Sequence, residues 1–125
     1  MWKNANGKLI HVTDVTREKF RTNISKAILE WLGALAEEND THVNYLIENG
    51  LENLLNDGFI TYNKKARPTD RTQYKTTYDK NLLAAARKFA ADHGLFVNDV
   101  IEYSVSYIDL DNCKDKTHKS RIEKL

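Results

Sequence analysis

The sequence contains one internal repeat. When the chain is shifted by 54 residues, residues 17–48 align with residues 71–102 without a gap, and nine of the 32 pairs are identical. Chance would give roughly two identities at ordinary amino-acid frequencies. We therefore interpret the chain as a duplication of one short structural unit. The identical pairs are Arg17/Arg71, Thr22/Thr76, Lys26/Lys80, Leu29/Leu83, Ala36/Ala90, Val43/Val97, Asn44/Asn98, Ile47/Ile101 and Glu48/Glu102.

Each copy begins with a short segment in which apolar and polar residues alternate. This period of two predicts a half-buried strand in residues 19–24 and another in residues 73–78. The expected inner faces carry Phe20, Thr22 and Ile24 in the first strand and Tyr74, Thr76 and Tyr78 in the second. The opposite, polar faces carry Lys19, Arg21 and Asn23 in the first strand and Gln73, Lys75 and Thr77 in the second.

Two helices are expected after each strand. Ser25 and Asp79 are favourable N-cap residues, and apolar residues then recur at helical spacing in 28–36 and 82–90. Trp31 lies in the first of these patterns and is predicted to belong to the core. Asp40 and Gly94 stand where a left-handed turn residue is expected. The second helices are predicted by apolar residues from Val43 to Leu55 and from Val97 to Ile108.

One strand alone would leave its backbone hydrogen-bonding groups unpaired. The two strands are therefore predicted to pair antiparallel within one molecule, with Arg21 opposite Lys75, above four helices. The fold class is mainly α with a two-stranded antiparallel ribbon, and the two repeats form one compact domain. The expected organisation is an N-terminal extension (1–16) with a short strand at 9–12, repeat 1 (17–55), a basic linker (56–70), repeat 2 (71–110) and a polar basic tail (111–125).

Several segments resemble a known family. Residues 20–26, 36–39 and 43–44 resemble the Arc/MetJ ribbon-helix-helix repressors, and residues 94–101 resemble the inter-helix turn and second-helix start of that family. The resemblance covers roughly 17–55 and 71–110. Family members usually pair two identical chains, so a tandem copy resembles the pseudo-dimeric TraY-type proteins of conjugative plasmids. The resemblance implies an intramolecular pseudo-dimer whose ribbon enters the major groove of double-stranded DNA.

In that docking mode the polar strand faces contact base edges. Arg and Lys suit guanine, Asn and Gln suit adenine, and a Thr methyl group suits thymine. The implied base-contacting residues are Lys19, Arg21, Asn23, Gln73, Lys75 and Thr77.

Phosphate contacts are expected from backbone amides at the starts of the second helices and from lysines of the linker. These residues are His42, Val43, Asn44, Phe96, Val97, Asn98, Lys64 and Lys65. Family members often have Ser or Thr where this chain has His42 and Phe96, so a hydroxyl contact is missing there. The His42 ring could add one phosphate hydrogen bond or simply face solvent. Asn44 and Asn98 are expected mainly to brace the inter-helix turn.

Other features restrict the class of function. The net charge is +1, but basic residues are concentrated in 56–71 and 111–125, which permits DNA binding without requiring it. The four histidines and the single cysteine, Cys113, have no metal-ligand spacing, and no catalytic motif is present. We therefore expect no enzyme activity, no metal and no cofactor. The absence of a signal-peptide pattern and of a disulfide pair favours a reducing cytoplasm. The resemblance implies a bacterial protein that associates with the nucleoid.

Two functions remain open at this point. The first is a DNA-binding protein that represses or regulates transcription, or that assists plasmid or phage DNA processing; an antitoxin is a variant of it. Several pseudo-dimers could then bind side by side on adjacent half-sites. The alternative is a protein–protein interaction module that has kept the fold and lost DNA binding.

Overall fold

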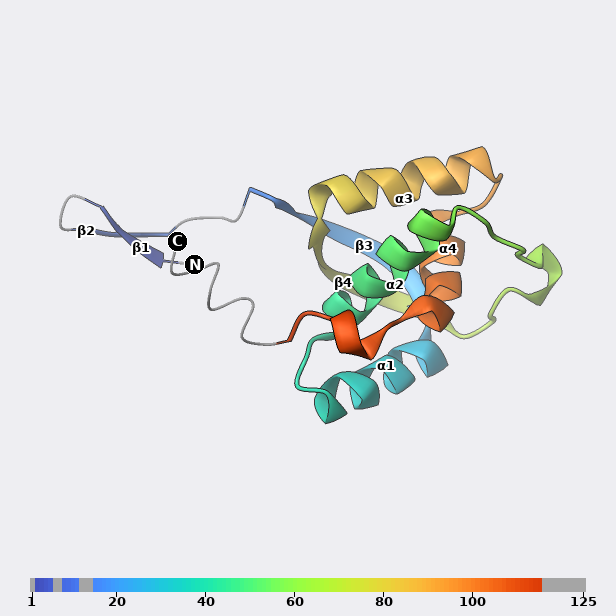
Figure 1. Cartoon of the computed structure of the whole chain (residues 1–125), viewed down its shortest axis with the longest axis horizontal. Coiled ribbons are helices and arrows are strands. Elements are labelled where there is room, and N and C mark those ends of the chain that lie inside the picture. Colours follow the sequence, from blue (N-terminus) through green and yellow to red (C-terminus); the bar gives the residue numbers. More distant parts are fainter. Residues whose placement is uncertain (1, 6–7, 12–14, 116–125) are drawn as a thin grey trace.

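The computed structural model describes residues 2–5, 8–11 and 15–115, with side chains described from Val15 to Asp115. Within these ranges the chain is mainly helical, with one long antiparallel ribbon and a separate short hairpin (Figure 1). The ribbon consists of β3 (Arg17–Ser25) and β4 (Arg71–Asp79). The helices are α1 (Lys26–Glu38), α2 (Val43–Asp57), α3 (Lys80–Asp92) and α4 (Val97–Ser104).

The two strands of the ribbon come from the two repeats. Their register places Arg21 opposite Lys75, Phe20 opposite Thr76 and Thr22 opposite Tyr74, which confirms the predicted antiparallel pairing. Ile24 and Tyr78 are buried on the inner face. The alternation of apolar and polar residues thus gives the ribbon one face toward the helices and one face toward solvent.

Each strand leads directly into a helix with a side-chain cap. The Ser25 hydroxyl accepts a hydrogen bond from the Ile28 amide (3.3 Å), and the Asp79 carboxylate accepts one from the Leu82 amide (2.9 Å). Such caps satisfy amides that have no acceptor within the helix. The two predicted N-caps are therefore confirmed, and the strand-to-helix transition is made in the same way in both repeats.

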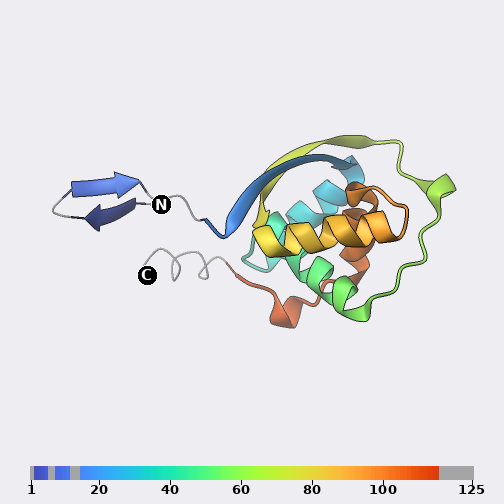
Figure 2. The same cartoon turned by 90° about the horizontal axis from the view of Figure 1, so that it is seen from above.

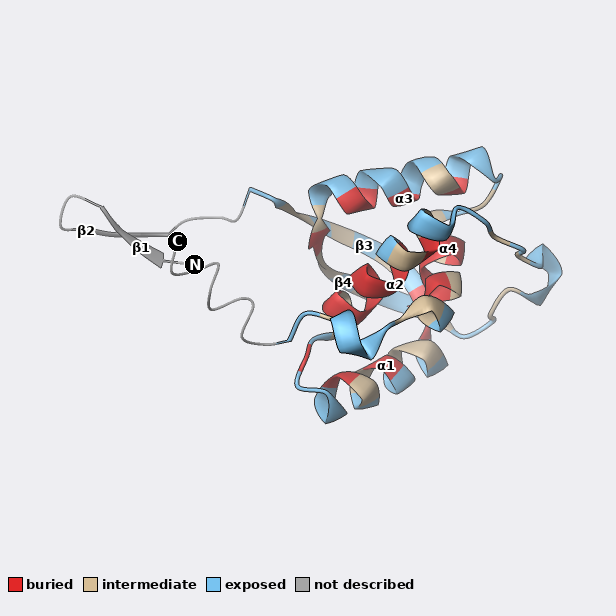
Figure 3. Ribbon diagram, in the orientation of Figure 1, coloured by how far each residue is buried: buried red, intermediate tan, exposed pale blue. Residues whose placement is uncertain are grey.

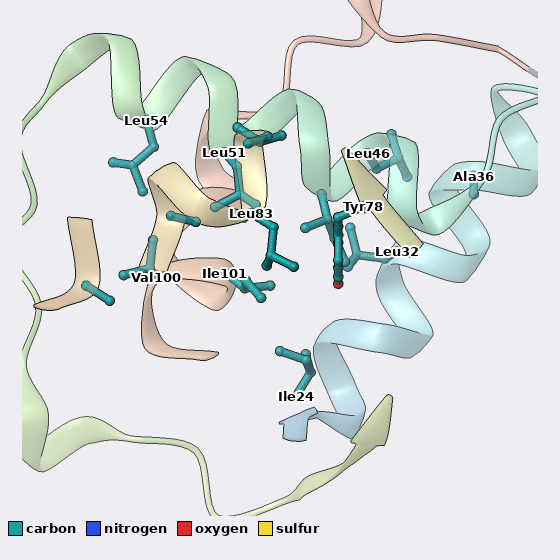
Figure 4. Close-up of a cluster of buried hydrophobic side chains, with 14 residues drawn as sticks. Ile24, Leu32, Ala36, Leu46, Leu51, Leu54, Tyr78, Leu83, Val100 and Ile101 are labelled. Atoms are coloured by element: carbon teal, nitrogen blue, oxygen red, sulfur yellow. The ribbon is translucent and has the colours of Figure 1, made fainter. Parts of the chain in front are cut away.

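The core lies between the ribbon and the four helices (Figure 4). α2 is buried along much of its length and packs against α4 and α3. A Cβ atom on Gly50 would overlap the backbone carbonyl of Ser104, so glycine permits the close approach at this crossing. The largest fully buried aliphatic side chains are Ile24, Leu32, Leu46, Ile47, Leu51, Leu54, Leu83, Val100 and Ile101.

The turns between paired helices follow the prediction. Asp40 has a φ of 51° and Gly94 a φ of 64°, so both adopt the left-handed conformation. Gly94 reaches it without a steric penalty, whereas Asp40 is a residue type that tolerates it. The equivalence of these two positions, 54 residues apart, extends the repeat into the backbone conformation.

Two expectations about the helices were wrong. Trp31 is not in the core: 52% of its surface is exposed, because it lies at the edge of the outward face of α1. The second helix of repeat 2 ends at Ser104, whose hydroxyl bonds the Ile101 carbonyl (2.6 Å) and competes with continued helix; a 3₁₀ turn (Val105–Tyr107) follows. The first residues of the predicted polar basic tail contact the helical body, since Cys113 packs against the core and the Thr41 hydroxyl donates to the Lys114 carbonyl.

The N-terminal extension forms a second, smaller sheet. β1 (Trp2–Ala5) pairs antiparallel with β2 (Lys8–His11), apart from the helical body (Figure 2). The strand expected at 9–12 is thus present as β2, while Val12 lies outside the described residues. In the described part of the chain, no helix has the length and apolar character needed to span a bilayer.

Candidate nucleic-acid interface

The outer face of the ribbon is a polar surface. Lys19, Arg21 and Asn23 of β3 are exposed, as are Gln73 and Lys75 of β4. Both strands of the ribbon cross the helical body on one side of the molecule (Figure 2). The helices cover the inner face, so the outer side chains are available to a ligand along the length of the ribbon.

Thr77, the sixth predicted base-contacting residue, has a different environment. It is half-buried, and the guanidinium of Arg17 lies 3.4 Å from its hydroxyl and 2.8 Å from its carbonyl oxygen. The hydroxyl is therefore occupied by a contact within the protein. The structure brings together five of the six predicted residues as a fully exposed set and leaves Thr77 at its margin.

Two cations face each other at the middle of this surface. Arg21 and Lys75 are directly opposite partners in the ribbon, and both are exposed. Like charges at directly opposed positions destabilise a sheet, and a bound anion relieves the repulsion. The centre of the ribbon is therefore suited electrostatically to a polyanion.

The ends of the ribbon are held by two equivalent ion pairs that sequence reasoning did not assign. We call the first, Arg17 with Glu48 of α2, the Glu48 junction; Arg17 Nη1 lies 2.9 Å from Glu48 Oε2. Glu48 Oε2 also accepts the backbone amide of Asp79 (2.8 Å). Each strand end is thereby fixed to a buried carboxylate, and Arg17 is drawn away from the outer surface.

The second ion pair, Arg71 with Glu102 of α4, we call the Glu102 junction. Arg71 Nη2 lies 2.5 Å from Glu102 Oε1, and Glu102 Oε2 accepts the backbone amide of Ser25 (2.8 Å). Every partner here is 54 residues from its equivalent at the Glu48 junction. The signal was present in the sequence, because both the arginine and the glutamate are identical in the two repeats.

Asn44 and Asn98 form another equivalent pair. Asn44 Nδ2 donates to the Thr77 carbonyl (3.1 Å), and Asn98 Nδ2 donates to the Asn23 carbonyl (3.0 Å). The expectation that they brace the inter-helix turn was therefore wrong: their amide groups fix each second helix to the strand of the other repeat. This contact orients the ribbon with respect to the starts of α2 and α4.

Asp99 gives the Glu102 junction a second carboxylate. Its side chain is fully buried and bonds Arg71 Nη2 (2.7 Å), Arg67 Nη2 (2.8 Å) and the Tyr62 hydroxyl (3.0 Å). Burial opposes the charged carboxylate, but the hydrogen bonds from Arg67 and Arg71 outweigh it and lower the pKa of Asp99 far below its usual value. Two linker residues are thus anchored to α4.

The helix starts differ in their capacity to hold a phosphate. At the start of α2, the His42 side chain makes no cap hydrogen bond. At the start of α4, the Phe96 amide donates to Asp99 Oδ2 (3.0 Å). The prediction that the Phe96 amide contacts phosphate is therefore corrected, because this buried carboxylate already occupies it.

The two linker lysines lie in a short 3₁₀ turn, Lys64–Ala66. The Asn63 side chain accepts the Lys65 amide (3.0 Å), and the Lys64 ammonium lies beside Gly94 at the turn between α3 and α4. Both lysines are exposed. The linker thus supplies positive charge close to the start of α4.

No model of a known family matches this chain, and comparisons with curated proteins and with solved structures also found no match. Among residues 2–5, 8–11 and 15–115, no group of three or more His, Cys, Asp or Glu side chains is placed to hold a metal ion.

Proposed function

We propose that the chain is a tandem ribbon-helix-helix protein, an intramolecular pseudo-dimer that binds double-stranded DNA sequence-specifically through the β3–β4 ribbon. The observation that carries the proposal is the outer ribbon face, on which Lys19, Arg21, Asn23, Gln73 and Lys75 are exposed around a directly opposed Arg–Lys pair. A two-stranded ribbon fits the major groove, and these side-chain types match the hydrogen-bonding edges of guanine and adenine.

The reciprocal contacts of the two repeats support the pseudo-dimer. Each repeat fixes the strand of the other through a buried glutamate, which accepts the backbone amide of Asp79 or Ser25, and through an asparagine side chain. Two identical chains related by a two-fold axis would make the same contacts. Within one chain the contacts form at high effective concentration, so the ribbon exists before DNA binds.

Phosphate contacts complete the proposed interface. The start of α2 contributes the amides of Val43 and Asn44, and the start of α4 contributes those of Val97 and Asn98. Lys64 and Lys65 reinforce the second site. Such contacts fix the position of the ribbon on the duplex, while the outer ribbon side chains select the sequence.

The test compares Arg21, which is proposed to contact a base, with Lys64, which is proposed to contact a phosphate. Arg21→Ala should weaken binding to the preferred duplex by about 1–3 kcal/mol and relax the preference at one base pair. Lys64→Ala should weaken binding to all sequences alike and lower the salt slope by about one. Lys88→Ala is the matched control, since it removes one exposed charge from the outer face of α3. Binding is measured in a salt series on preferred and scrambled duplexes that hold one molecule.

The proposed role is regulatory rather than catalytic. In the bacterial cytoplasm, at the nucleoid, the protein would repress or regulate a promoter, or assist plasmid or phage DNA processing; an antitoxin would use the same ribbon. Deletion of the gene followed by transcript profiling and plasmid-transfer assays separates these roles.

The alternative function is a protein–protein interaction module with this fold. The exposed Trp31 and the acidic outer face of α1 favour it. If folded Arg21→Ala protein keeps both the affinity and the sequence preference of the wild type, the ribbon does not read DNA and this alternative replaces the proposal.

A further inference from the structure

The outward faces of α1 and α3 carry opposite charges. The exposed charged residues of α1 are three acids and one base: Glu30, Glu37, Glu38 and Lys26. Those of α3 are three bases and one acid: Lys80, Arg87, Lys88 and Asp92. Lys88 lies 3.0 Å from Asp92 and Arg87 lies 3.3 Å from Glu18, and both pairs are exposed, so the face keeps a net positive charge. The two helices occupy equivalent places in the two repeats, yet they have diverged to opposite sign. Their outer faces lie on opposite sides of the body and are exposed along their length (Figure 3).

The same two faces also differ in the size of their exposed side chains. On α1, Trp31 is half-exposed beside the exposed Ala27 and Ala34. On α3, three small residues are exposed: Ala84, Ala85 and Ala91. Ala85 is the repeat equivalent of Trp31. One face therefore presents a large aromatic ring, and the other presents small side chains between cations. A tryptophan packs well over such a surface, and a lysine at its rim adds a cation–π contact.

We propose that α1 of one molecule docks on α3 of a second copy of this chain. This interaction goes beyond the proposed DNA binding. Docking of α1 on another α1 would bring two acidic faces together, and docking of α3 on α3 would bring two basic faces together, so charge selects the mixed pair. The contact joins two different faces on opposite sides of one molecule. An assembly of any number of copies therefore keeps an α1 face free at one end and an α3 face free at the other. The association is head-to-tail and extends beyond the dimer.

Sedimentation of the whole chain tests the association itself. From roughly 10 µM to roughly 1 mM, the range expected for a contact of one helix face, the mean mass should rise from that of the 14.4 kDa monomer past that of a dimer. Added salt should lower the mean mass at a given concentration, because the attraction between the faces is largely electrostatic. A monomer throughout the range, or a mass that stops at the dimer, would overturn the proposal.

Two blocked variants test which faces meet. Trp31→Lys blocks the α1 face, and the double variant Ala84→Glu/Lys88→Glu blocks the α3 face; each variant alone should remain a monomer. An equimolar mixture has one intact face of each kind and should form a dimer that grows no further. Glu30→Lys/Glu37→Lys replaces Trp31→Lys if the latter melts below the wild type. If one blocked variant associates like the wild type, or if the mixture stays monomeric while the wild type associates, the α1–α3 contact is refuted.

Discussion

The Glu48 and Glu102 junctions perform the same task with different amounts of buried charge. At the first, Arg17 meets one carboxylate, and its guanidinium lies 5.9 Å from the ring centre of Tyr45. At the second, the position equivalent to Tyr45 is Asp99, so Arg71 contacts two carboxylates. The extra charge is balanced by Arg67 from the linker. The two repeats share the arginine and the glutamate and differ at one neighbouring position, where Asp99 anchors the segment that connects the repeats.

The largest difference between the junctions should appear when Asp99 is neutralised. Asp99→Asn leaves Arg67 and Arg71 short of a buried counter-charge and should lower the free energy of unfolding by about 3 kcal/mol. Urea unfolding followed by circular dichroism measures the loss. Tyr62→Phe, which removes only one hydrogen bond from the same carboxylate, is the control and should cost about 1 kcal/mol. If Asp99→Asn costs no more than this control, the linker anchor does not depend on charge.

Acid should weaken the Glu102 junction through Asp99. The pKa of Asp99 is lower in the folded protein than in the unfolded chain, so the unfolded chain takes up its proton at the higher pH. The stabilisation is complete well above the ordinary pKa of about 4 and is lost progressively as the pH falls from that value through the lower pKa of the folded protein. Thermal melts from pH 7 downward should show a smaller acid loss for Asp99→Asn than for the wild type. Parallel curves for the two proteins would contradict this assignment.

At the first junction the effect should be smaller. Glu48→Gln keeps an acceptor for the Asp79 amide and removes the charge that pairs with Arg17. The expected cost is about 2 kcal/mol, since one charge-assisted contact is lost. Glu102→Gln, the equivalent change in the other repeat, leaves Arg71 with Asp99 and should cost less. Equal costs measured by urea unfolding would show that Asp99 does not support Arg71.

The smallest effects concern the inner face of the ribbon, where Ile24 in one strand corresponds to Tyr78 in the other. The Tyr78 hydroxyl is buried, and no partner is found for it among the described residues; burial raises the pKa of this phenol. Tyr78→Phe should therefore stabilise the protein by about 1 kcal/mol. Ile24→Val should instead destabilise it by about 1 kcal/mol, because it leaves a void. A loss of stability in Tyr78→Phe would show that the hydroxyl has a partner in solution.

Much of the fold could be predicted from the sequence because its signals are local or repeated. The alternation in residues 19–24 and 73–78 predicted the two strands of the ribbon, and the gapless offset of 54 predicted their register. The cap residues predicted where α1 and α3 begin. The end of α4 was missed because it depends on the packing of Ser104 against α2 rather than on periodicity. Trp31 was misplaced because an apolar residue at the edge of a helical stripe has no signal that separates core from surface.

The site was predicted less completely, for a physical reason. Exposure of the strand residues followed from the alternation, but the contact of Arg17 with Thr77 joins residues 60 positions apart, and spacing along the chain does not predict it. The contact of the Phe96 amide with Asp99 is local, and the spacing of three residues at a helix start was a signal that sequence reasoning missed. The identities of Arg17 with Arg71 and of Glu48 with Glu102 did point to a shared structural role, although not to its partners.

The divergence of the two strands allows the most direct test of DNA reading. Lys19, Arg21 and Asn23 on β3 are unlike Gln73, Lys75 and Thr77 on β4, so one molecule should contact a base-pair core without two-fold symmetry. Selection from a random duplex library, with fragments long enough for only one molecule, measures this core. We expect enrichment of one sequence whose two halves differ, and loss of preference at one position with Arg21→Ala. No enrichment over the starting library, or a perfectly palindromic core beneath a single molecule, would contradict the account.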